Sequence, residues 1–397
     1  MQLQQPLAPP HEISAASKSP AEISFFPQEA RILLVANSAW NLWNFRRSLF
    51  QQLQILGCRV ITAAPADDFS AHLSHFIALR HLSRKSLSPL SNLRTLGELI
   101  RVLRSQKPGL AVFYTIKPNI FGAWAARLSG VPSVAVIEGL GYTARAHPLL
   151  RRMIFRLYRS ALSHSRKVIF LNHDDQAEFL YHRMVTPGKT LVIKGVGVDT
   201  EYFKPGIFPA GANVGDTFLF IGRLLHDKGI REFVRAASLI KQVYPAARFQ
   251  ILGGLDEDNP ASIAAGELSA WLDEAVVEYL GQTDDVRPYI AAADAVVLPS
   301  YREGMPRVLL EGMAMGKPVI TTDSVGCRDT VDEGENGFII PSENSEALRQ
   351  ALLRFLQLNP EDRAEMGRKS REKALREFSN EAVLRQYIRV FWECGRF

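Results

Sequence analysis

The sequence predicts an α/β fold with two doubly wound, Rossmann-like domains that face a cleft, followed by helices at the C-terminus. Three observations support this prediction. From residue 31 onward, short β-branched runs alternate with amphipathic stretches of helical length, which is typical of parallel sheets with crossover helices. The chain has 397 residues, more than one hydrophobic core usually organises. A segment rich in Gly and Pro interrupts the alternation near the middle of the chain.

The first half of the chain contains the strands expected for one parallel sheet. The first strand is RILLVA at 31–36, and a helix is expected at 44–56. Further β-branched runs begin at positions 58, 110, 131, 167 and 190. Residues 1–29 are rich in Pro, Gln, Ser and Ala and lack the charged-then-apolar order of a signal peptide, so we expect a disordered leader there.

The second half repeats this alternation. TFLFIG at 217–222 precedes a helix expected at 229–243, and the runs ARFQILGG, VVEYLG, DAVVLPS and KPVITT each precede a further helical pattern. We expect an N-terminal domain at 30–205, a linker at 206–215, a second domain at 216–378 and a C-terminal helix at 379–397 that returns to the first domain. Ligands of open parallel sheets bind beyond the carboxyl ends of the strands, so the cleft is the expected site.

Composition excludes several classes of protein. A content of 47% hydrophobic and 22% charged residues excludes a disordered, collagenous or coiled-coil chain. The three cysteines are far apart and fit neither a disulfide framework nor a zinc site, which favours a reducing, cytoplasmic compartment. Arg or Lys interrupts every apolar run before it reaches the length of a membrane helix.

Charge is distributed unevenly along the chain. Residues 1–205 carry 25 Lys and Arg against 12 Asp and Glu, whereas the remainder carries 22 against 29, and the whole chain has a net charge of +6. Such an asymmetry points to an anionic partner for the first half.

The pattern of carboxylates and glycines in YREGMPRVLLEGMAMGKPVI predicts a binding site. Glu303 is expected in the loop after a strand, and Glu311 about two turns down a helix that starts near Met305. Both carboxylates could accept hydrogen bonds from a polyol, and the helix N-terminus could bind an anion. The alternative is that Glu303 caps the helix and Glu311 is solvated.

The segment FIGRLLHDKGIREF predicts a diphosphate site. Arg223 and Lys228 lie in the loop between a strand and a helix. Two cations at this position could stabilise the charge that a leaving diphosphate develops as its bond breaks. The alternative is that both are ordinary solvated cations of a surface loop.

Together these residues resemble the family 4 glycosyltransferases, retaining enzymes of the GT-B fold, over nearly the whole chain after residue 31. The shared motifs are Glu303-x7-Glu311, the Gly-Arg-Leu…Lys-Gly pattern around Arg223 and Lys228, the segment 197–205, and Gly-Lys-Pro-Val at 316–319. More narrowly, 44–46, 115–119, 139–142, 172–175 and 326–328 resemble the bacterial enzymes that extend capsular repeats and lipid-linked oligosaccharides, including N-acetylgalactosaminyltransferases acting on undecaprenyl-diphosphate sugars.

The resemblance implies an acceptor-binding N-terminal domain, a sugar-nucleotide-binding C-terminal domain and no cofactor or metal. Arg223 and Lys228 would bind the donor diphosphate, Glu311 its ribose and Glu303 the transferred sugar. The donor is expected to be a UDP-linked hexose or N-acetylhexosamine, and its base should lie near 281–286. Further substrate contacts are expected from the site loop and from the acceptor side, at Gly304, Met305, Pro306, Arg307, Asn44, Arg46, Lys117 and Asn119.

Some features depart from the family pattern or stay open. The loop NSAWNLWNFR carries Trp40 and Trp43 where many relatives carry paired glycines, which suggests acceptor or lid contacts. Glu138 ends a strand on the acceptor side and could orient the attacking hydroxyl, or simply bind nearby N–H groups. His147 and His173 are expected to be loop or helix-start residues. Asp256-x-Asp258 is expected to be a solvated loop rather than a metal site.

A basic segment at 145–167 has seven Lys or Arg and no acid. If Pro148 starts a helix, Arg152, Arg156 and Arg159 form one stripe, as in helices that lie on anionic bilayers. We therefore expect a peripheral protein on the inner face of the cytoplasmic membrane; the alternative is a helix with a solvated basic face. No nucleic-acid partner is expected.

The function expected from the sequence is transfer of a sugar onto a lipid-diphosphate-linked glycan with retention of configuration. Two alternatives remain open at this stage. One is a retaining transferase that uses a soluble or lipopolysaccharide acceptor. The other is a non-catalytic sugar-nucleotide-binding protein on the same fold.

Overall fold

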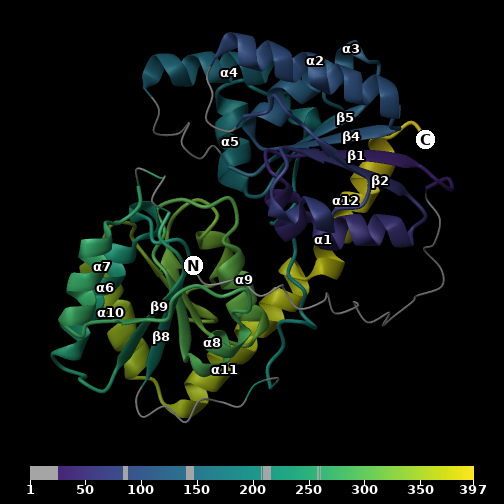
Figure 1. The fold of residues 1–397 in the computed structure, drawn as a ribbon. Coiled ribbons are helices and arrows are strands. Elements are labelled where there is room, and N and C mark those ends of the chain that lie inside the picture. The colour runs from purple at the N-terminus through teal and green to yellow at the C-terminus, as the bar shows by residue number, and fades with distance from the viewer. Residues whose placement is uncertain are drawn as a thin grey trace.

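A computed structural model describes residues 26–83, 88–139, 147–206, 208, 216–256, 259 and 261–397. It contains two parallel sheets, each covered by helices, so the expected pair of α/β domains is confirmed (Figure 1). The expected leader lies outside the described residues up to position 25, but Phe26 is 3% exposed and packs edge-on against Trp392 and Phe397. The end of that segment therefore belongs to the folded core. Positions 207 and 209–215 of the expected linker also lie outside the described residues.

The N-terminal domain is built on a seven-stranded sheet in the order β3-β2-β1-β4-β5-β6-β7. Every neighbouring pair in it is parallel. The strands are β1 (Arg31–Val35), β2 (Arg59–Ala64), β3 (Phe76–Ala78), β4 (Leu110–Tyr114), β5 (Ser133–Ile137), β6 (Lys167–Phe170) and β7 (Thr190–Val192). The helices are α1 (Ala39–Ile55), α2 (Pro89–Gln106), α3 (Ala123–Leu128), α4 (Pro148–Leu162) and α5 (His173–Tyr181).

The C-terminal domain repeats the design with six parallel strands in the order β10-β9-β8-β11-β12-β13. The strands are β8 (Thr217–Ile221), β9 (Arg248–Leu252), β10 (Glu278–Tyr279), β11 (Ala295–Leu298), β12 (Val319–Thr322) and β13 (Gly337–Ile340). The helices are α6 (Ile230–Lys241), α7 (Ala265–Asp273), α8 (Arg287–Ala292), α9 (Arg307–Ala314), α10 (Ser345–Leu356) and α11 (Pro360–Lys373).

The last helix, α12 (Asn380–Cys394), leaves the C-terminal domain and packs on the first one. It lies beside α1 (Figure 1). Its buried face joins the core between the N-terminal sheet and α1, through Val383, Leu384, Tyr387, Val390, Phe391 and Cys394. The chain thus crosses between the domains twice, once after β7 and once before α12.

One helix begins well before its expected position because of a capping residue. Helix α1 starts five residues earlier than expected, at Ala39, since the Ser38 hydroxyl accepts a hydrogen bond from the Asn41 N–H at 3.1 Å. Helix α9 starts at Arg307, close to the start expected near Met305, with Pro306 at its N-cap position.

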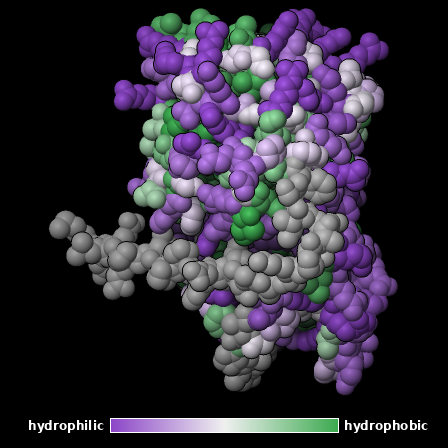
Figure 2. Space-filling view, turned by 90° about the vertical axis from the view of Figure 1, so that its right-hand side faces the viewer, coloured by the Kyte–Doolittle hydropathy of each residue, from purple (hydrophilic) through white to green (hydrophobic). Residues whose placement is uncertain are grey.

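The surface is mostly polar on the face shown in Figure 2, where hydrophilic residues predominate and hydrophobic ones form small separate patches. Within the part of the chain that the structure describes, no helix combines the length and hydrophobicity needed to cross a membrane. All three cysteines are buried and free.

Candidate active site in the cleft between the domains

Lys228 and Glu303 form an ion pair at the carboxyl ends of β8 and β11. Their side chains are 20% and 14% exposed. The same Glu303 oxygen, Oε1, accepts a hydrogen bond from the Ser300 hydroxyl at 2.8 Å. The pair combines one cation and one carboxylate that a ligand in the cleft can reach. The alternative that Glu303 merely caps α9 is not met, because Pro306 occupies the N-cap position of that helix.

A glycine allows the two loops of this pair to approach each other. Gly229 follows Lys228 with φ of 72°, in the left-handed region that favours glycine. A Cβ at this position would lie 2.0 Å from the carbonyl oxygen of Pro299, the residue after the neighbouring strand β11. The loop after β8 therefore needs glycine here to bring Lys228 to Glu303.

Arg223, expected beside Lys228 at a diphosphate site, has a different partner. Its Nη1 lies 2.7 Å from Asp256 Oδ2, and its side chain is 50% exposed. Asp256 is therefore paired with a cation, which differs from the solvated loop that its sequence context predicts. Asp258, the second acid of that motif, lies outside the described residues. The two candidate phosphate-binding cations thus each lie against a carboxylate.

Glu311 lies in α9 and is buried, with 7% of its surface exposed. Arg307, one turn earlier, places Nε at 2.8 Å from Glu311 Oε1. Burial raises the pKa of the Glu311 carboxyl, and the nearby Arg307 guanidinium lowers it in part. Arg307 also donates to the carbonyl oxygen of Asn44 in α1, so this residue connects the two domains across the cleft.

Glu138 directly follows β5, in the N-terminal domain. Its carboxylate contacts the Arg46 guanidinium and, at 3.5 Å, the Asn41 side-chain amide. Arg46 is 2% exposed and lies 4.3 Å from the centre of the Tyr114 ring. Arg46 therefore holds Glu138 in place, and its own guanidinium is covered by protein.

The other expected acceptor-side residues have structural contacts. Asn119 is 1% exposed, and its amide donates to the Val136 carbonyl oxygen at 2.9 Å. The Lys117 ammonium donates to the Ser83 carbonyl oxygen at 2.6 Å. The Asn44 amide donates to the Trp40 carbonyl oxygen at 3.0 Å. Of these three residues, Asn44 also contacts the C-terminal domain, because its carbonyl oxygen accepts a hydrogen bond from Arg307.

The two histidines and two tryptophans occupy the starts of helices. His147 is the N-cap of α4 and His173 is the first residue of α5, as expected for helix-start residues. Trp43 stacks on His72 with ring centres 4.9 Å apart, whereas Trp40 is 46% exposed. Both tryptophans thus lie at the start of α1 rather than in a loop, and Trp40 is exposed enough to contact a ligand.

The Glu303 loop touches the N-terminal domain directly. A Cβ at Gly304 would lie 2.1 Å from the Glu138 carbonyl oxygen, so only glycine permits this approach. Met305, the next residue, packs against both the C-terminal core and the core beneath α1 and α12. The donor-side and acceptor-side candidates therefore meet at one place.

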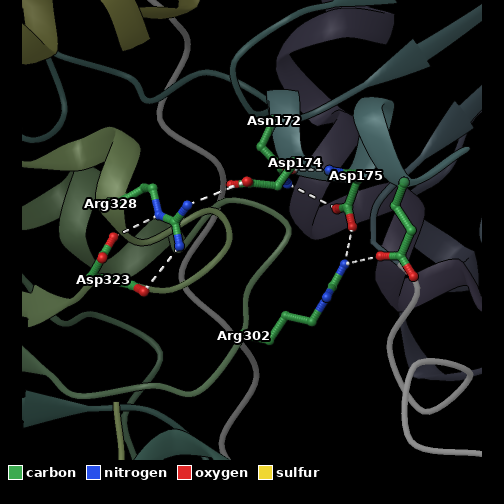
Figure 3. Close-up of polar contacts among 7 residues, drawn as sticks. Asn172, Asp174, Asp175, Arg302, Asp323 and Arg328 are labelled. Carbon is green, nitrogen blue, oxygen red and sulfur yellow. Dashed lines mark hydrogen bonds and ion pairs between the residues drawn. The ribbon is translucent and has the colours of Figure 1, made fainter. Parts of the chain in front are cut away.

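Polar contacts join the domains beside this loop (Figure 3). Arg302 contacts Asp175, and Arg328 lies 3.3 Å from Asp174. Asp174, Asp175 and Arg328 lie in the motifs at 172–175 and 326–328, whereas Arg302 lies in neither, and a pairing between positions more than a hundred residues apart has no local signal in the sequence.

Family models for sugar-transferring enzymes match both domains of this chain. Residues 45–202 match the Glycosyltransferase Family 4 model, and residues 215–358 match the model called Glycosyl transferases group 1. The chain is a glycosyltransferase, since the two matches together cover most of it. It is therefore a hexosyltransferase. The family 4 match covers the domain that contains Glu138, and the group 1 match covers the domain that contains Lys228 and Glu303.

Curated relatives of this glycosyltransferase act in bacterial glycan synthesis. It is 27% identical over 91% of its length to the N,N'-diacetylbacillosaminyl-diphospho-undecaprenol alpha-1,3-N-acetylgalactosaminyltransferase of Campylobacter jejuni, covering 98% of that protein. It is also 27% identical to the UDP-Gal:alpha-D-GlcNAc-diphosphoundecaprenol alpha-1,3-galactosyltransferase of Escherichia coli, over 68% of this chain and 72% of that one.

Solved structures show the same fold. A sucrose-phosphate synthase from Thermosynechococcus elongatus superposes with a TM-score of 0.77, at 21% identity, over 92% of this chain and 99% of that one. HepE from Anabaena, solved in complex with UDP, superposes with a TM-score of 0.75 at 19% identity, over 91% and 100% of the two chains. These likenesses establish the GT-B-type arrangement of the glycosyltransferase.

The described residues contain no cluster of three or more His, Cys, Asp or Glu side chains arranged to hold a metal ion. The charged side chains described at the candidate site include Lys228, Arg223 and the carboxylates that pair with them.

Proposed function

We propose that this glycosyltransferase moves a hexose or N-acetylhexosamine from a UDP-sugar onto a lipid-diphosphate-linked glycan, with retention of configuration, in the synthesis of a surface polysaccharide or glycan. The observation that carries the proposal is the Lys228–Glu303 pair, whose loop approaches the backbone of Glu138 at Gly304. Relatives named for undecaprenyl-diphosphate acceptors support the acceptor class.

Each cleft residue has a role in this scheme. Arg223 and Lys228 bind the donor diphosphate and stabilise the charge that grows on it as the glycosidic bond breaks. Glu303 accepts hydrogen bonds from hydroxyl groups of the transferred sugar, and Glu311 accepts them from the ribose. The backbone of 304–307 lies alongside the sugar and phosphate.

Glu138 is placed to receive the acceptor. Its carboxylate is 21% exposed and is held by Arg46, so it can accept a hydrogen bond from the attacking hydroxyl without moving. In this proposal the hydroxyl attacks from the side of the departing phosphate, and that phosphate takes up the proton. The new bond then has the configuration of the old one, and no covalent enzyme intermediate forms.

The reaction is proposed to need no metal, because the two cations take the place that a divalent ion would have on the diphosphate. Turnover should then be unchanged in excess EDTA. A loss of turnover in EDTA that Mg²⁺ or Mn²⁺ restores would contradict this part of the proposal.

Helix α4 is proposed to dock the enzyme on the inner face of the cytoplasmic membrane, which is anionic and would hold the lipid-diphosphate acceptor. Arg152, Arg156 and Arg159 are all exposed. Leu149 and Met153, on the same helix, are 71% and 50% exposed. Exposed apolar residues beside arginines are typical of a helix that lies in the interface of an anionic bilayer.

The test is a turnover assay with purified full-length enzyme. A panel of radiolabelled UDP-sugars is offered with undecaprenyl-diphosphate-linked acceptors, and NMR determines the anomeric configuration of the product. Transfer to the lipid-linked acceptor with retention supports the proposal. Transfer only to a soluble glycan or lipopolysaccharide, inversion, a trapped covalent glycosyl-enzyme adduct, or UDP-sugar binding without transfer would each contradict it.

A further inference from the structure

The loop that carries Glu303 is fastened to the N-terminal domain on both sides of that residue. On one side, the Arg302 guanidinium contacts the Asp175 carboxylate and lies 3.1 Å from Glu178 Oε2 (Figure 3). On the other side, the Gly304 carbonyl oxygen accepts a hydrogen bond from the Asn172 amide at 2.8 Å. Both anchors come from the start of α5, so a single element of the N-terminal domain fixes the loop.

The N-terminal side of this contact is preorganised. Asn172 and Asp175 are each fully buried. Asn172 caps α5 by accepting from the Asp175 N–H at 2.8 Å, and its amide also donates to Asp175 Oδ2 at 2.9 Å. The two side chains therefore hold each other in the orientation in which they meet the Glu303 loop.

In the Arg302–Asp175 ion pair, the Asp175 side chain is buried and the Arg302 side chain is 28% exposed. Burial raises the pKa of Asp175, and the Arg302 charge lowers it in part. A buried carboxylate is costly without a partner charge, and here the partner charge comes from the other domain. The contact is therefore stable only when the domains are together as in this structure.

A second cross-domain contact has a different character. Arg328 lies 3.3 Å from Asp174 and 2.8 Å from Asp323, and all three side chains are between 37% and 63% exposed. Exposed ion pairs of this kind contribute little to stability because water and salt screen them. The Arg328–Asp174 pair thus provides a matched control, with the same residue types across the same cleft.

We infer that Asn172, Asp175 and Arg302 are positioning residues that hold Glu303 in its working place only when the domains are closed. This inference rests on the proposed function, because it assigns Glu303 to the transferred sugar. The nucleotide would bind to the C-terminal domain without this contact, whereas the sugar would be correctly placed only with it. Breaking the contact should then lower kcat more than it weakens nucleotide binding.

The first test compares Arg302→Gln and Asp175→Asn with the control variants Arg328→Gln and Asp174→Asn, in the full-length enzyme. A small misplacement of a reacting group costs about 10²-fold in rate, so each of the first two variants should lose on the order of 10- to 100-fold in kcat. Affinity for UDP, measured by calorimetry, should change less than about threefold, and the control variants should be near wild type.

Rescue and coupling separate positioning from a general loss of structure. Arg302→Lys keeps the charge but not the planar guanidinium, whose Nη2 contacts both Asp175 and Glu178, so it should recover part of the activity that Arg302→Gln loses. The double variant Asp175→Asn with Arg302→Gln should lose no more than the worse single variant, because both act through one contact. Additive losses, or an equal fall in UDP affinity, would overturn the inference.

A second readout does not need turnover. Hydrogen exchange of peptides covering 299–306 should speed up at least several-fold in Arg302→Gln and Asp175→Asn, with peptides of the C-terminal core unchanged and the control variants like wild type. Unchanged exchange in 299–306 would overturn the inference even if the enzyme proved to use another acceptor. Faster exchange with no transferase activity in wild type would instead contradict the proposed function and leave the positioning contact supported.

Discussion

At the scale of single residues, the chemistry of the site depends on charges that are held in place by neighbours. Glu303 is oriented by Lys228 and by the Ser300 hydroxyl. Glu138 is oriented by Arg46, which is itself buried under Tyr114. In each case a carboxylate that could contact a sugar is fixed by a cation, so the side chain loses little freedom when a substrate binds.

The first prediction concerns this Lys228–Glu303 pair. Lys228→Ala and Glu303→Ala should each reduce kcat/KM for the UDP-sugar by about 10²- to 10³-fold, the usual cost of removing a group that stabilises developing charge. Neither residue lies in an α-helix or a strand, and part of each side chain is exposed, so the fold should be retained, as checked by circular dichroism and thermal melting.

The control for this prediction is Lys204→Ala. Lys204 forms an exposed pair with Glu201 at 3.5 Å, with side chains 50% and 75% exposed. Its removal should leave activity near wild type. If Lys228→Ala also retains near-normal kcat/KM, then the assignment of the diphosphate site is wrong.

The second prediction concerns Glu311 and pH. Its pKa is raised in the folded protein by burial, so ionisation is less favourable there than in the unfolded chain. The destabilisation from this charge is therefore absent below the ordinary pKa of a glutamate and present at neutral pH. Glu311→Gln should raise Tm by about 2–4 °C at pH 8, equivalent to about 1 kcal/mol, and by less at pH 4.

The same substitution should weaken the binding of UDP, because an amide accepts hydrogen bonds from the ribose less strongly than a carboxylate does. Differential scanning fluorimetry at the two pH values and calorimetry with UDP provide the measurements. An equal change in Tm at pH 4 and pH 8 would show that burial of the charge is not the cause. Unchanged UDP affinity would remove Glu311 from the nucleotide site.

Some residue-scale contacts could be predicted from the sequence and others could not. Lys228, Glu303 and Glu311 follow strands in a regular α/β alternation, so their place at the carboxyl edge of a sheet follows from order alone. Arg46 was expected to contact substrate, yet it is buried against Glu138, 92 positions away. Burial of a charge is decided by which helix covers which strand end, and that is a property of the packed domain.

At the scale of elements, α4 shows how much of a helix the sequence pattern can predict. Its start at Pro148 and the exposure of its three arginines match the expectation, because proline at a first turn is a strong local signal. The start of α1 was missed because Ser38 caps the helix outside the apolar periodicity. The presence of a helix in this segment was predicted correctly, although its first residue was not.

The third prediction tests α4 as a membrane contact. Changing Arg152, Arg156 and Arg159 to Glu should abolish flotation with vesicles that contain anionic lipid, since each cation near such a surface contributes about 1 kcal/mol. Wild type should float with these vesicles and should lose the association in high salt.

The matched control changes Arg376, Arg385 and Arg389 to Glu, which alters net charge by the same amount on another surface. All three are exposed, and each lies near a glutamate in the same segment of chain. This control should float like wild type. Equal binding by the α4 variant and wild type would remove the membrane role, and equal loss in both variants would show that only net charge matters.

At the scale of the whole molecule, the division of charge acquires a structural meaning. The basic first half forms the domain that carries α4, and the acidic second half forms the domain that carries Arg223 and Lys228 as individually paired cations. The two domains meet through the Glu303 loop, through α12, and through the contacts of Arg302 and Arg307. The alternation of strands and helices could predict two domains, but the closed arrangement depends on glycines such as Gly304 and on pairs between distant positions.

The last prediction follows from the return of α12 to the N-terminal domain. Phe391 is fully buried and Tyr387 is 2% exposed, with its hydroxyl 3.3 Å from the Gly195 carbonyl oxygen. Phe391→Ala should cost about 3–5 kcal/mol, and the loss should fall on the N-terminal domain although the residue comes at the end of the chain. Calorimetry should then show an N-terminal transition that moves to lower temperature, separate from that of the C-terminal domain.

Leu375→Ala is the control for this prediction, because Leu375 precedes α12 and is 43% exposed. Surface substitutions of this kind usually change stability by less than about 0.5 kcal/mol. UDP affinity should persist in Phe391→Ala at temperatures below its first transition, since the residues assigned to the nucleotide lie in the other domain. If both domains instead lose stability together, then α12 stabilises the interface between them, and the chain unfolds as one cooperative unit rather than as two linked ones.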